Sequence, residues 1–403
     1  MTYYILITLC IIILIAYIFE ITGKYSKIPG VILLMCFGLL LRYFSTNLGI
    51  SIPDLSILLP IMGTLGLILI VLEGSMDLTL SSEKKQLVFK SLVSAVFLFL
   101  LQLILLSGVL IYYFHIPFKT ALINSIPFGI ISSAVAIPSS VNLKKGDREF
   151  IVYESSISDI VGILLFDFVV FNHLPLGQGI LFFSFEVIVT IIFSVIISGA
   201  LAYMLHKIGH HVKYVIILTV VILIFTVAKL ILWPSLIVVL IFGLILNNTH
   251  FFQTKFILRH IDFHEFNLNL KSFKQITGEL TFLVRSFFFL IFGFYTSTSE
   301  LLNLKNLGYS ISICFSIYLF RALFYKYILR KSLTPLLFFA PRGLITILLF
   351  LSIPAELKLP FMGEGLITQI IFISILFMAI GNILTVRRKE KVLSETDKPE
   401  VVI

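Results

Sequence analysis

Four side chains in residues 149–171 have the types and the spacing to hold a proton or a small cation. Glu154 and Ser158 are four residues apart, as are Ser155 and Asp159, so each pair is stacked on one surface of a helix. Carboxylate and hydroxyl oxygens are hard ligands, which suit Na⁺, Li⁺ or protons better than soft metals. A charge inside apolar sequence is costly and usually functional. A helix–helix contact held by serines is the structural alternative.

The composition is that of a polytopic helical membrane protein. Of the 403 residues, 59% are apolar and only 13% are charged, a balance that soluble domains do not show. The net charge of +9 does not indicate a nucleic-acid partner, because the basic residues lie in short connections between apolar spans. Cys10, Cys36 and Cys314 are widely spaced within apolar spans, so we expect neither a disulfide nor a zinc site, and no cofactor.

Apolar spans long enough to cross a bilayer occur about thirteen times along the chain. We expect them at residues 3–20, 28–46, 57–79, 87–114, 120–141, 149–171, 179–206, 212–232, 234–249, 277–297, 307–329, 332–353 and 365–386. The eighth and ninth are separated only by Trp233-Pro234-Ser235, so twelve or fourteen spans stay possible. The sequence thus predicts a transmembrane domain over residues 1–386 and a short charged tail over 387–403.

The connections alternate in charge. Those that follow odd-numbered spans carry most of the basic residues, such as Lys84 and Lys85, so the positive-inside rule makes that side cytoplasmic. The expectation is an integral protein of a bacterial inner membrane with its N-terminus outside and its C-terminus in the cytoplasm. In the one long connection, 250–276, phenylalanines interleave with basic residues, which predicts a helix on the inner membrane face; a plain hydrophilic connector is the alternative.

Two spans are predicted to be interrupted. Residues 120–141 contain IPFGIISSAVAIPSS (126–140), and residues 332–353 contain a proline, an arginine and a glycine in mid-span at 341–343. Proline and glycine at this depth break helices and free backbone groups that need partners in a cavity, although each could be a simple kink. If the chain is folded about a linker helix at 179–206, the two spans match. This predicts inverted six-helix repeats, about 3–171 and 212–386, with discontinuous helices that cross.

Further charges lie in the apolar spans. Five of them sit near span ends or lack polar neighbours, and we expect interfacial or paired structural charges there: Asp77, Asp167, Glu186, Lys229 and Arg321.

Several motifs resemble those of monovalent cation:proton antiporters of the NhaP-like group. YESSISD (153–159) is similar to that group's ESLLND signature, VLEGSMDL (71–78) resembles FEGGLDL, and APRGLI (340–345) resembles the RGA segment. IPGVILLMCFGLLL (28–41) fits the second helix of the family, and VRSFFFLIFG (284–293) looks like the tenth. In this order the motifs cover nearly the whole chain.

The resemblance implies an ion site. Asp159 would carry a proton and a Na⁺ or K⁺ ion alternately, holding the metal only transiently, with Ser155 as a hydroxyl ligand and Glu73 as a lining carboxylate. Ser158 stands where relatives carry an asparagine before the aspartate. The family's Thr-Asp-Pro is missing from the fifth span, and we expect Ser132 and Ser133 to supply oxygens instead.

The resemblance also implies two charge pairs and an oligomeric state. Glu154 and Arg342 would form a buried ion pair between the sixth and twelfth spans, and breaking such a pair costs about 3–5 kcal/mol. Glu279 would be the partner of Arg285 on the tenth span, a possible modulating pair. Relatives of this kind lead us to expect a homodimer.

These observations favour a secondary transporter that exchanges protons for Na⁺ or K⁺ by alternating access, with the lipid bilayer as its surroundings. A single carrier carboxylate predicts electroneutral one-for-one exchange. The spans at 120–141, 149–171, 332–353 and 365–386 would move as a rigid body. A non-transporting ion or pH sensor on the same scaffold is the alternative, motivated by the missing Thr-Asp. An intramembrane acyltransferase is disfavoured, since no metal-spaced or nucleophilic motif accompanies the eight histidines, and we expect no enzyme.

Overall fold

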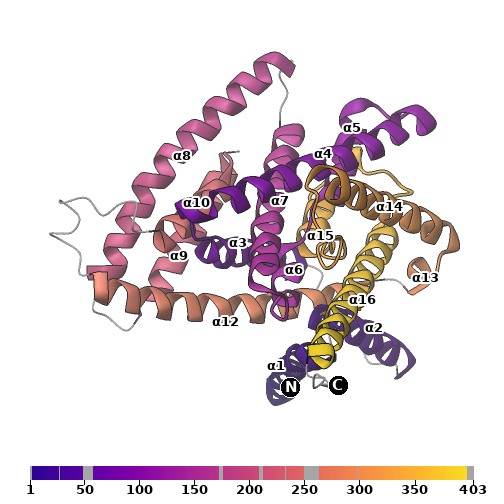
Figure 1. The fold of residues 1–403 in the computed structure, drawn as a ribbon, viewed down its shortest axis with the longest axis horizontal. Coiled ribbons are helices and arrows are strands. Elements are labelled where there is room, and N and C mark those ends of the chain that lie inside the picture. Colours follow the sequence, from indigo (N-terminus) through magenta and orange to yellow (C-terminus); the bar gives the residue numbers. More distant parts are fainter. Residues whose placement is uncertain are drawn as a thin grey trace, which may run out of the picture.

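The chain folds into an all-helical bundle (Figure 1). The computed structural model describes residues 2–26, 28–48, 58–171, 176–207, 212–231, 233–248, 263–296 and 298–396. The described α-helices are α1 (Thr2–Ser26), α2 (Gly30–Leu48), α3 (Leu58–Asp77), α4 (Lys85–Phe114), α5 (Phe118–Gly129), α6 (Ser133–Ser139), α7 (Lys145–Phe171), α8 (Leu176–Lys207), α9 (Lys213–Leu230), α10 (Ser235–Asn247), α12 (Phe263–Tyr295), α13 (Thr298–Leu301), α14 (Leu304–Leu323), α15 (Leu344–Leu351) and α16 (Glu364–Thr396). Helix α14 continues as the π-helix η3 (Phe324–Ile328). Two short 3₁₀ turns are η1 (Ser82–Lys84) and η4 (Ala355–Leu357).

Every expected span coincides with a helix or an interrupted helix of the described chain. Nine described helices or helix pairs are long and apolar enough to cross a membrane, while α1 and α10 contain shorter apolar stretches. The apolar part of α7 also carries Glu154, Asp159 and Asp167, which sets it apart from an ordinary lipid-facing helix. The predicted fold class is therefore confirmed.

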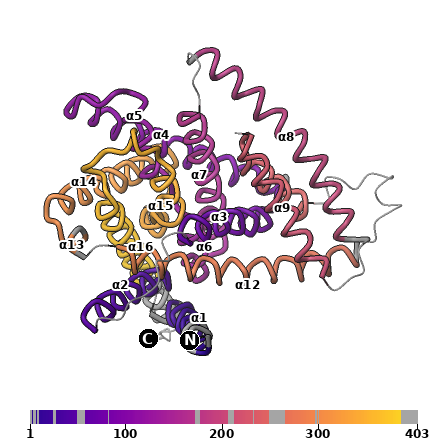
Figure 2. The backbone as a smooth tube through the Cα atoms, turned by 180° about the vertical axis from the view of Figure 1, so that it is seen from behind, coloured from indigo at the N-terminus to yellow at the C-terminus, as the bar shows by residue number. Residues whose placement is uncertain are grey.

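The helix contacts define two groups, and both views place α8, α9 and α10 of one group on the opposite side of the bundle from α5, α14 and α16 of the other (Figures 1 and 2). In one group, α12 packs on α2 and α3, and α10 packs on α3 and α8; in the other, α4 packs on α5 and α7, and α14 packs on α16. The groups meet where α3 contacts α7 and α15. Since α7 lies along this boundary, its polar face is at a junction between the two groups and is not turned to lipid.

Close helix contacts explain two of the glycines. A Cβ atom on Gly38 of α2 would lie 2.3 Å from the Leu290 carbonyl oxygen, and one on Gly293 of α12 would lie 2.3 Å from the Met35 carbonyl oxygen. These neighbours are backbone atoms and cannot rotate away. Small residues at helix crossings let membrane helices approach closely, so the two glycines set the spacing of α2 and α12.

The expected helix on the membrane face at 250–276 is wrong for its second half. Residues 263–276 are continuous with the tenth span in α12, and 250–262 lie outside the described residues. Phe266 and Phe273, seven residues apart, are fully buried in the bundle. Lys274 Nζ donates to the Met76 carbonyl oxygen at 2.5 Å and to Asn247 Oδ1 at 2.7 Å. The apolar face of this segment therefore packs on other helices and not on lipid. The alternation of apolar and basic residues in the sequence is the same in both cases, so it could not distinguish them.

Most of the five charges that we expect to be interfacial or paired do have a charged partner. Lys229 Nζ lies 2.7 Å from Asp167 Oδ1, and Lys274 Nζ lies 3.9 Å from Asp77 Oδ1. Glu186 on α8 is half-buried. Arg321 is paired too, but at 1% exposure it does not reach an interface. Arg321 instead lies inside the bundle, in the region of the candidate site.

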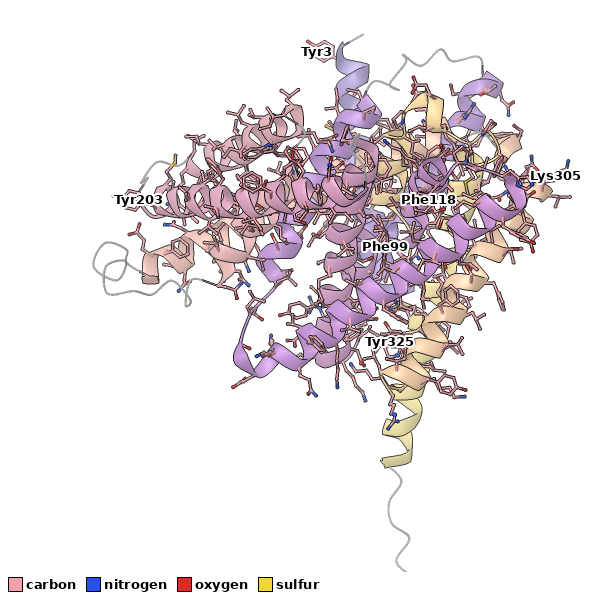
Figure 3. The ribbon with its side chains drawn as sticks, turned by 90° about the horizontal axis from the view of Figure 1, so that it is seen from above. Tyr3, Phe99, Phe118, Tyr203, Lys305 and Tyr325 are labelled. Carbon is pink, nitrogen blue, oxygen red and sulfur yellow. The ribbon has the colours of Figure 1, made fainter. Side chains whose placement is uncertain are left out.

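The chain's last expected span continues into the tail. Residues 387–396 extend α16 as a helix beyond the bundle, and the segment after Thr396 lies outside the described residues (Figure 3).

Candidate ion-binding site

Two non-helical segments interrupt the fifth and twelfth spans, as the sequence predicts. Helix α5 ends at Gly129 and α6 begins at Ser133, with Ile130 and Ser132 in extended conformation between them. The twelfth span, expected as a helix over 332–353, is helical only from Leu344: residues 333–338 form a bend and turns, residues 339–343 are irregular, and α15 follows. The Ser132 N–H donates to the Pro341 carbonyl oxygen at 2.9 Å, so the two segments touch. The freed backbone groups thus become partners for each other.

A glycine makes this contact possible. A Cβ atom on Gly343 would lie 2.7 Å from Ser132 Oγ and 2.9 Å from Val135 Cγ2. Any larger residue at position 343 would push the two non-helical segments apart. The glycine in the APRGLI motif is therefore explained by close approach.

Asp159 lies beside the extended segment of the fifth span. Its side chain is buried, and Oδ2 accepts the Ser133 N–H at 3.3 Å. The preceding residue, Ser158, contacts the same segment: its Oγ accepts the Ile131 N–H at 3.0 Å. Oδ1 of Asp159 has no hydrogen-bond partner among the described residues. A buried carboxylate oxygen without a partner is costly, so this atom is where a proton or a cation would bind.

The other predicted site residues are three serines, at or next to α6 and on α7, and one carboxylate, Glu73 on α3. Ser132 Oγ is buried at the crossing and has no partner in the described part of the chain, whereas Ser133 acts through its N–H. Ser155 Oγ donates to the Ile151 carbonyl oxygen at 2.8 Å, which leaves its lone pairs free. Glu73 is half-buried on α3 and faces α12, where a Cβ on Gly278 would lie 3.5 Å from its Oε1.

The predicted ion pair of Glu154 with Arg342 is wrong. Glu154 instead pairs with Arg321 of α14: Oε2 lies 2.6 Å from Nη2 and Oε1 lies 3.0 Å from Nη1. Tyr325 donates its hydroxyl to Oε1 at 2.7 Å, and Ser94 of α4 donates to the same oxygen. Figure 3 shows Tyr325 near the end of α14. The guanidinium also donates to the Leu336 and Phe339 carbonyl oxygens, so this buried network ties α7, α14 and the twelfth span together.

Arg342 binds backbone carbonyls. Its Nε donates to the Phe128 oxygen at 2.8 Å and its Nη1 to the Ala340 oxygen at 3.0 Å. Phe128 lies at the end of α5, where helix carbonyls lack partners and carry partial negative charge. The non-helical backbone of residues 339–343 places the Arg342 side chain at this helix end, so the pair with Glu154 that the resemblance implies does not form.

The predicted pair of Glu279 with Arg285 is also wrong. The two residues are six apart on α12, which places them about 240° apart around the helix. Glu279 is exposed and accepts a bond from Gln275 at 3.1 Å. Arg285 donates from Nη1 to the Ala134 oxygen at 3.1 Å, and its Nη2 lies 3.5 Å from Glu20 Oε1 of α1.

A cavity of about 100 Å³ approaches the site from the end of the bundle that carries the basic connections. Its polar lining includes Glu20, Arg285, Ser139, Asn142 and Asn382. The cavity reaches Ala134, the neighbour of the residue whose N–H binds Asp159. Asp159 itself is separated from it by the start of α6.

Two functional features were missed from the sequence. Tyr325 follows Arg321 by four residues, a spacing that stacks both on one helix surface and could have indicated a polar cluster. Glu20 is the only acidic residue in residues 1–26, a signal that a charge-by-charge reading of the first span would have found.

A helical membrane bundle in which two interrupted segments cross beside a buried carboxylate defines a secondary transporter of small ions. The chain belongs to the sodium/hydrogen exchanger family, whose transmembrane family model matches residues 9–388. It is accordingly a transporter and not an enzyme, and the acyltransferase alternative is set aside.

The fold is similar to solved structures of the sodium proton antiporter MjNhaP1 from Methanocaldococcus jannaschii. One, at pH 8, matches with 20% identity and a TM-score of 0.68 over 95% of this chain and 96% of that chain. A second, from electron microscopy, matches with 18% identity and a TM-score of 0.68 over the whole of both chains. No curated protein matches the chain.

Proposed function

We propose that this antiporter exchanges protons for Na⁺ or K⁺ at Asp159, one for one. The observation that carries the proposal is the carboxylate itself: one oxygen accepts the Ser133 N–H, and the other is buried without a hydrogen-bond partner in the described part of the chain. A bare charge in this position has lost its water, so the site favours occupation by either a proton or a cation. Both occupants neutralise the same single charge, which makes exchange electroneutral.

The cation's ligands follow from the oxygens at the crossing. Asp159 Oδ1 supplies the charge, Ser132 Oγ has no partner among the residues that the structure describes, and Ser155 Oγ keeps free lone pairs one turn away on α7. These hard oxygens suit an alkali cation that retains part of its water. Arg285 supports the one-for-one ratio, since it binds Ala134 and Glu20 and leaves Asp159 as the proton-exchanging group.

Alternating access fits the uneven ends of the bundle. The cavity opens toward the basic connections, which the positive-inside rule assigns to the cytoplasm, so the N-terminus would lie outside. At the opposite end, Lys229 of α9 pairs with Asp167 of α7 at 2.7 Å, across the boundary between the two helix groups. The proposal is that this end is closed here and that the pair separates when the site faces outward. We also propose that the protein is a homodimer in a bacterial inner membrane.

Purified protein in liposomes tests the exchange. Addition of Na⁺ or K⁺ is expected to dissipate an imposed pH gradient, with Li⁺ compared in parallel, and clamping the membrane potential is expected to leave the initial rate unchanged. A rate that rises under the clamp would overturn the one-for-one ratio. Absence of any cation-dependent flux would overturn transport and favour the sensor on the same scaffold.

Cross-linking across the far end tests alternating access. In a background without the three native cysteines, Asp167→Cys combined with Lys229→Cys is expected to lose nearly all exchange when a short thiol cross-linker joins the pair. The control is Gln102→Cys with Ser316→Cys, whose side chains are 3.0 Å apart within one helix group. Cross-linking that pair is expected to leave flux near its starting value. Full activity of the joined 167–229 pair would exclude movement at this boundary.

A further inference from the structure

The cavity on the basic side contains one arginine and one carboxylate that face each other. Arg285 is 8% exposed, and its Nη2 lies 3.5 Å from Oε1 of Glu20, which comes from α1, 265 residues away in the chain. Both residues line the cavity. The other polar side chains among the described lining residues are neutral, namely Ser139, Asn142 and Asn382, so Glu20 is the one acid among those residues. Glu73 of α3 also interacts electrostatically with Arg285, but it does not line the cavity.

The arginine is a problem for an approaching cation. Its Nη1 donates to the Ala134 oxygen at 3.1 Å, one residue from the Ser133 N–H that binds Asp159. A cation that reaches Asp159 from this cavity therefore passes close to a fixed positive charge. Repulsion between like charges is strong where little water screens it, so an unneutralised arginine would lower the concentration of cations at the site.

Space for the carboxylate is provided by the start of α2. A Cβ atom on Gly30 would lie 3.2 Å from Glu20 Oε2, tighter than ordinary contact. The glycine of the IPG sequence therefore leaves Glu20 free to face the cavity. Since the Glu20 side chain is 29% exposed, the pair is partly hydrated and contributes little to folding. A role in stability alone does not explain its position.

Resting on the proposed exchange, we propose that Glu20 determines cation access from the basic side: it neutralises Arg285 and forms the first, hydrated docking position for the incoming cation. Its action on the exchange is through Arg285 and through the local cation concentration, and Asp159 remains the carrier. The first helix thereby takes part in transport, although it belongs to the other helix group from α6 and α7.

The test is the concentration dependence of exchange in vesicles of defined orientation, with the cation added on the cavity side. Glu20→Gln is expected to raise KM for the cation about 10-fold, a modest effect for electrostatic focusing, while kcat changes less than about twofold. Added choline chloride is expected to reduce the KM difference, because salt screens exposed charges. Cation added on the opposite side is expected to show an unchanged KM.

Two variants separate this role from a structural one. Glu20→Asp keeps the charge and is expected to hold KM near the wild-type value, and Glu20→Gln combined with Arg285→Gln is expected to bring KM back toward it. An unaltered KM in Glu20→Gln, with wild-type flux intact, overturns the inference and leaves the exchange standing. A uniform loss of kcat in Glu20→Gln and the double variant also overturns it, since that result indicates a structural tie. Absence of flux in the wild type contradicts the exchange itself.

Discussion

Asp159→Asn is expected to reduce cation-dependent proton flux by about 100-fold or more. The amide has the size of the carboxylate and can still accept the Ser133 N–H, so the crossing of the two non-helical segments is expected to survive. It cannot neutralise a cation or take up a proton. Contacts to a charged group contribute up to about 3 kcal/mol, and every ~1.4 kcal/mol is tenfold, so loss of the carboxylate is sufficient for an effect of this size.

The measurement is dissipation of a pH gradient in everted vesicles or proteoliposomes at matched protein content. Asp147→Asn is the control, because it makes the same chemical change in the first turn of the same helix, α7, away from the crossing. We expect that variant to transport like the wild type. If Asp159→Asn retains full activity, Asp159 is not the carrier and the proposed mechanism falls.

Arg321→Met is expected to lower the free energy of unfolding by about 3–5 kcal/mol, the largest stability effect we expect from a single charge. The change leaves the Glu154 carboxylate buried at 1% exposure with no cation beside it. It also removes the guanidinium N–H groups that donate to the Leu336 and Phe339 carbonyl oxygens and hold the twelfth span on α14. Unfolding in detergent, followed by a thiol-reactive or intrinsic probe, measures the change.

A double variant shows whether the loss of stability comes from the Glu154 charge that is left without a partner. Combining Arg321→Met with Glu154→Gln removes the uncompensated charge, so we expect it to be more stable than Arg321→Met alone. Lys305→Gln, exposed in the first turn of the same helix, is expected to change stability by less than about 0.5 kcal/mol (Figure 3). If the double variant is as unstable as the single one, the cost does not come from a stranded carboxylate.

The elements of the candidate ion site were largely recognisable from local sequence. Asp159, Ser158 and the interruption at Ser132–Ser133 were each indicated by a residue type that is out of place in an apolar span. Such signals are local, because the cost of a charge or of a broken helix in a membrane is incurred wherever that residue lies. The structure adds that Asp159 Oδ1 and Ser132 Oγ have no hydrogen-bond partner within the described ranges of the chain.

The charge pairs were not predictable in the same way. Arg342 and Arg321 are both arginines in apolar spans, and either could have faced Glu154 on the strength of position along the span. The choice depended on α14 packing beside α4 and on the non-helical backbone of residues 339–343, which places the Arg342 side chain at the end of α5. No periodicity reports the direction of a side chain on a non-helical segment inside a helical protein.

By itself the sequence determined the class of protein, its spans, the two interruptions and the buried acid, since hydrophobicity, proline, glycine and charge act within a single span. Only the tertiary structure decided the partners of the arginines. Glu20 and Arg285, 265 residues apart, meet because α1, α2 and α12 pack together around glycines, and that contact is set by the shapes of three helices. The sequence around either residue of such a long-range pair does not indicate its partner, because the pairing depends on how distant helices pack.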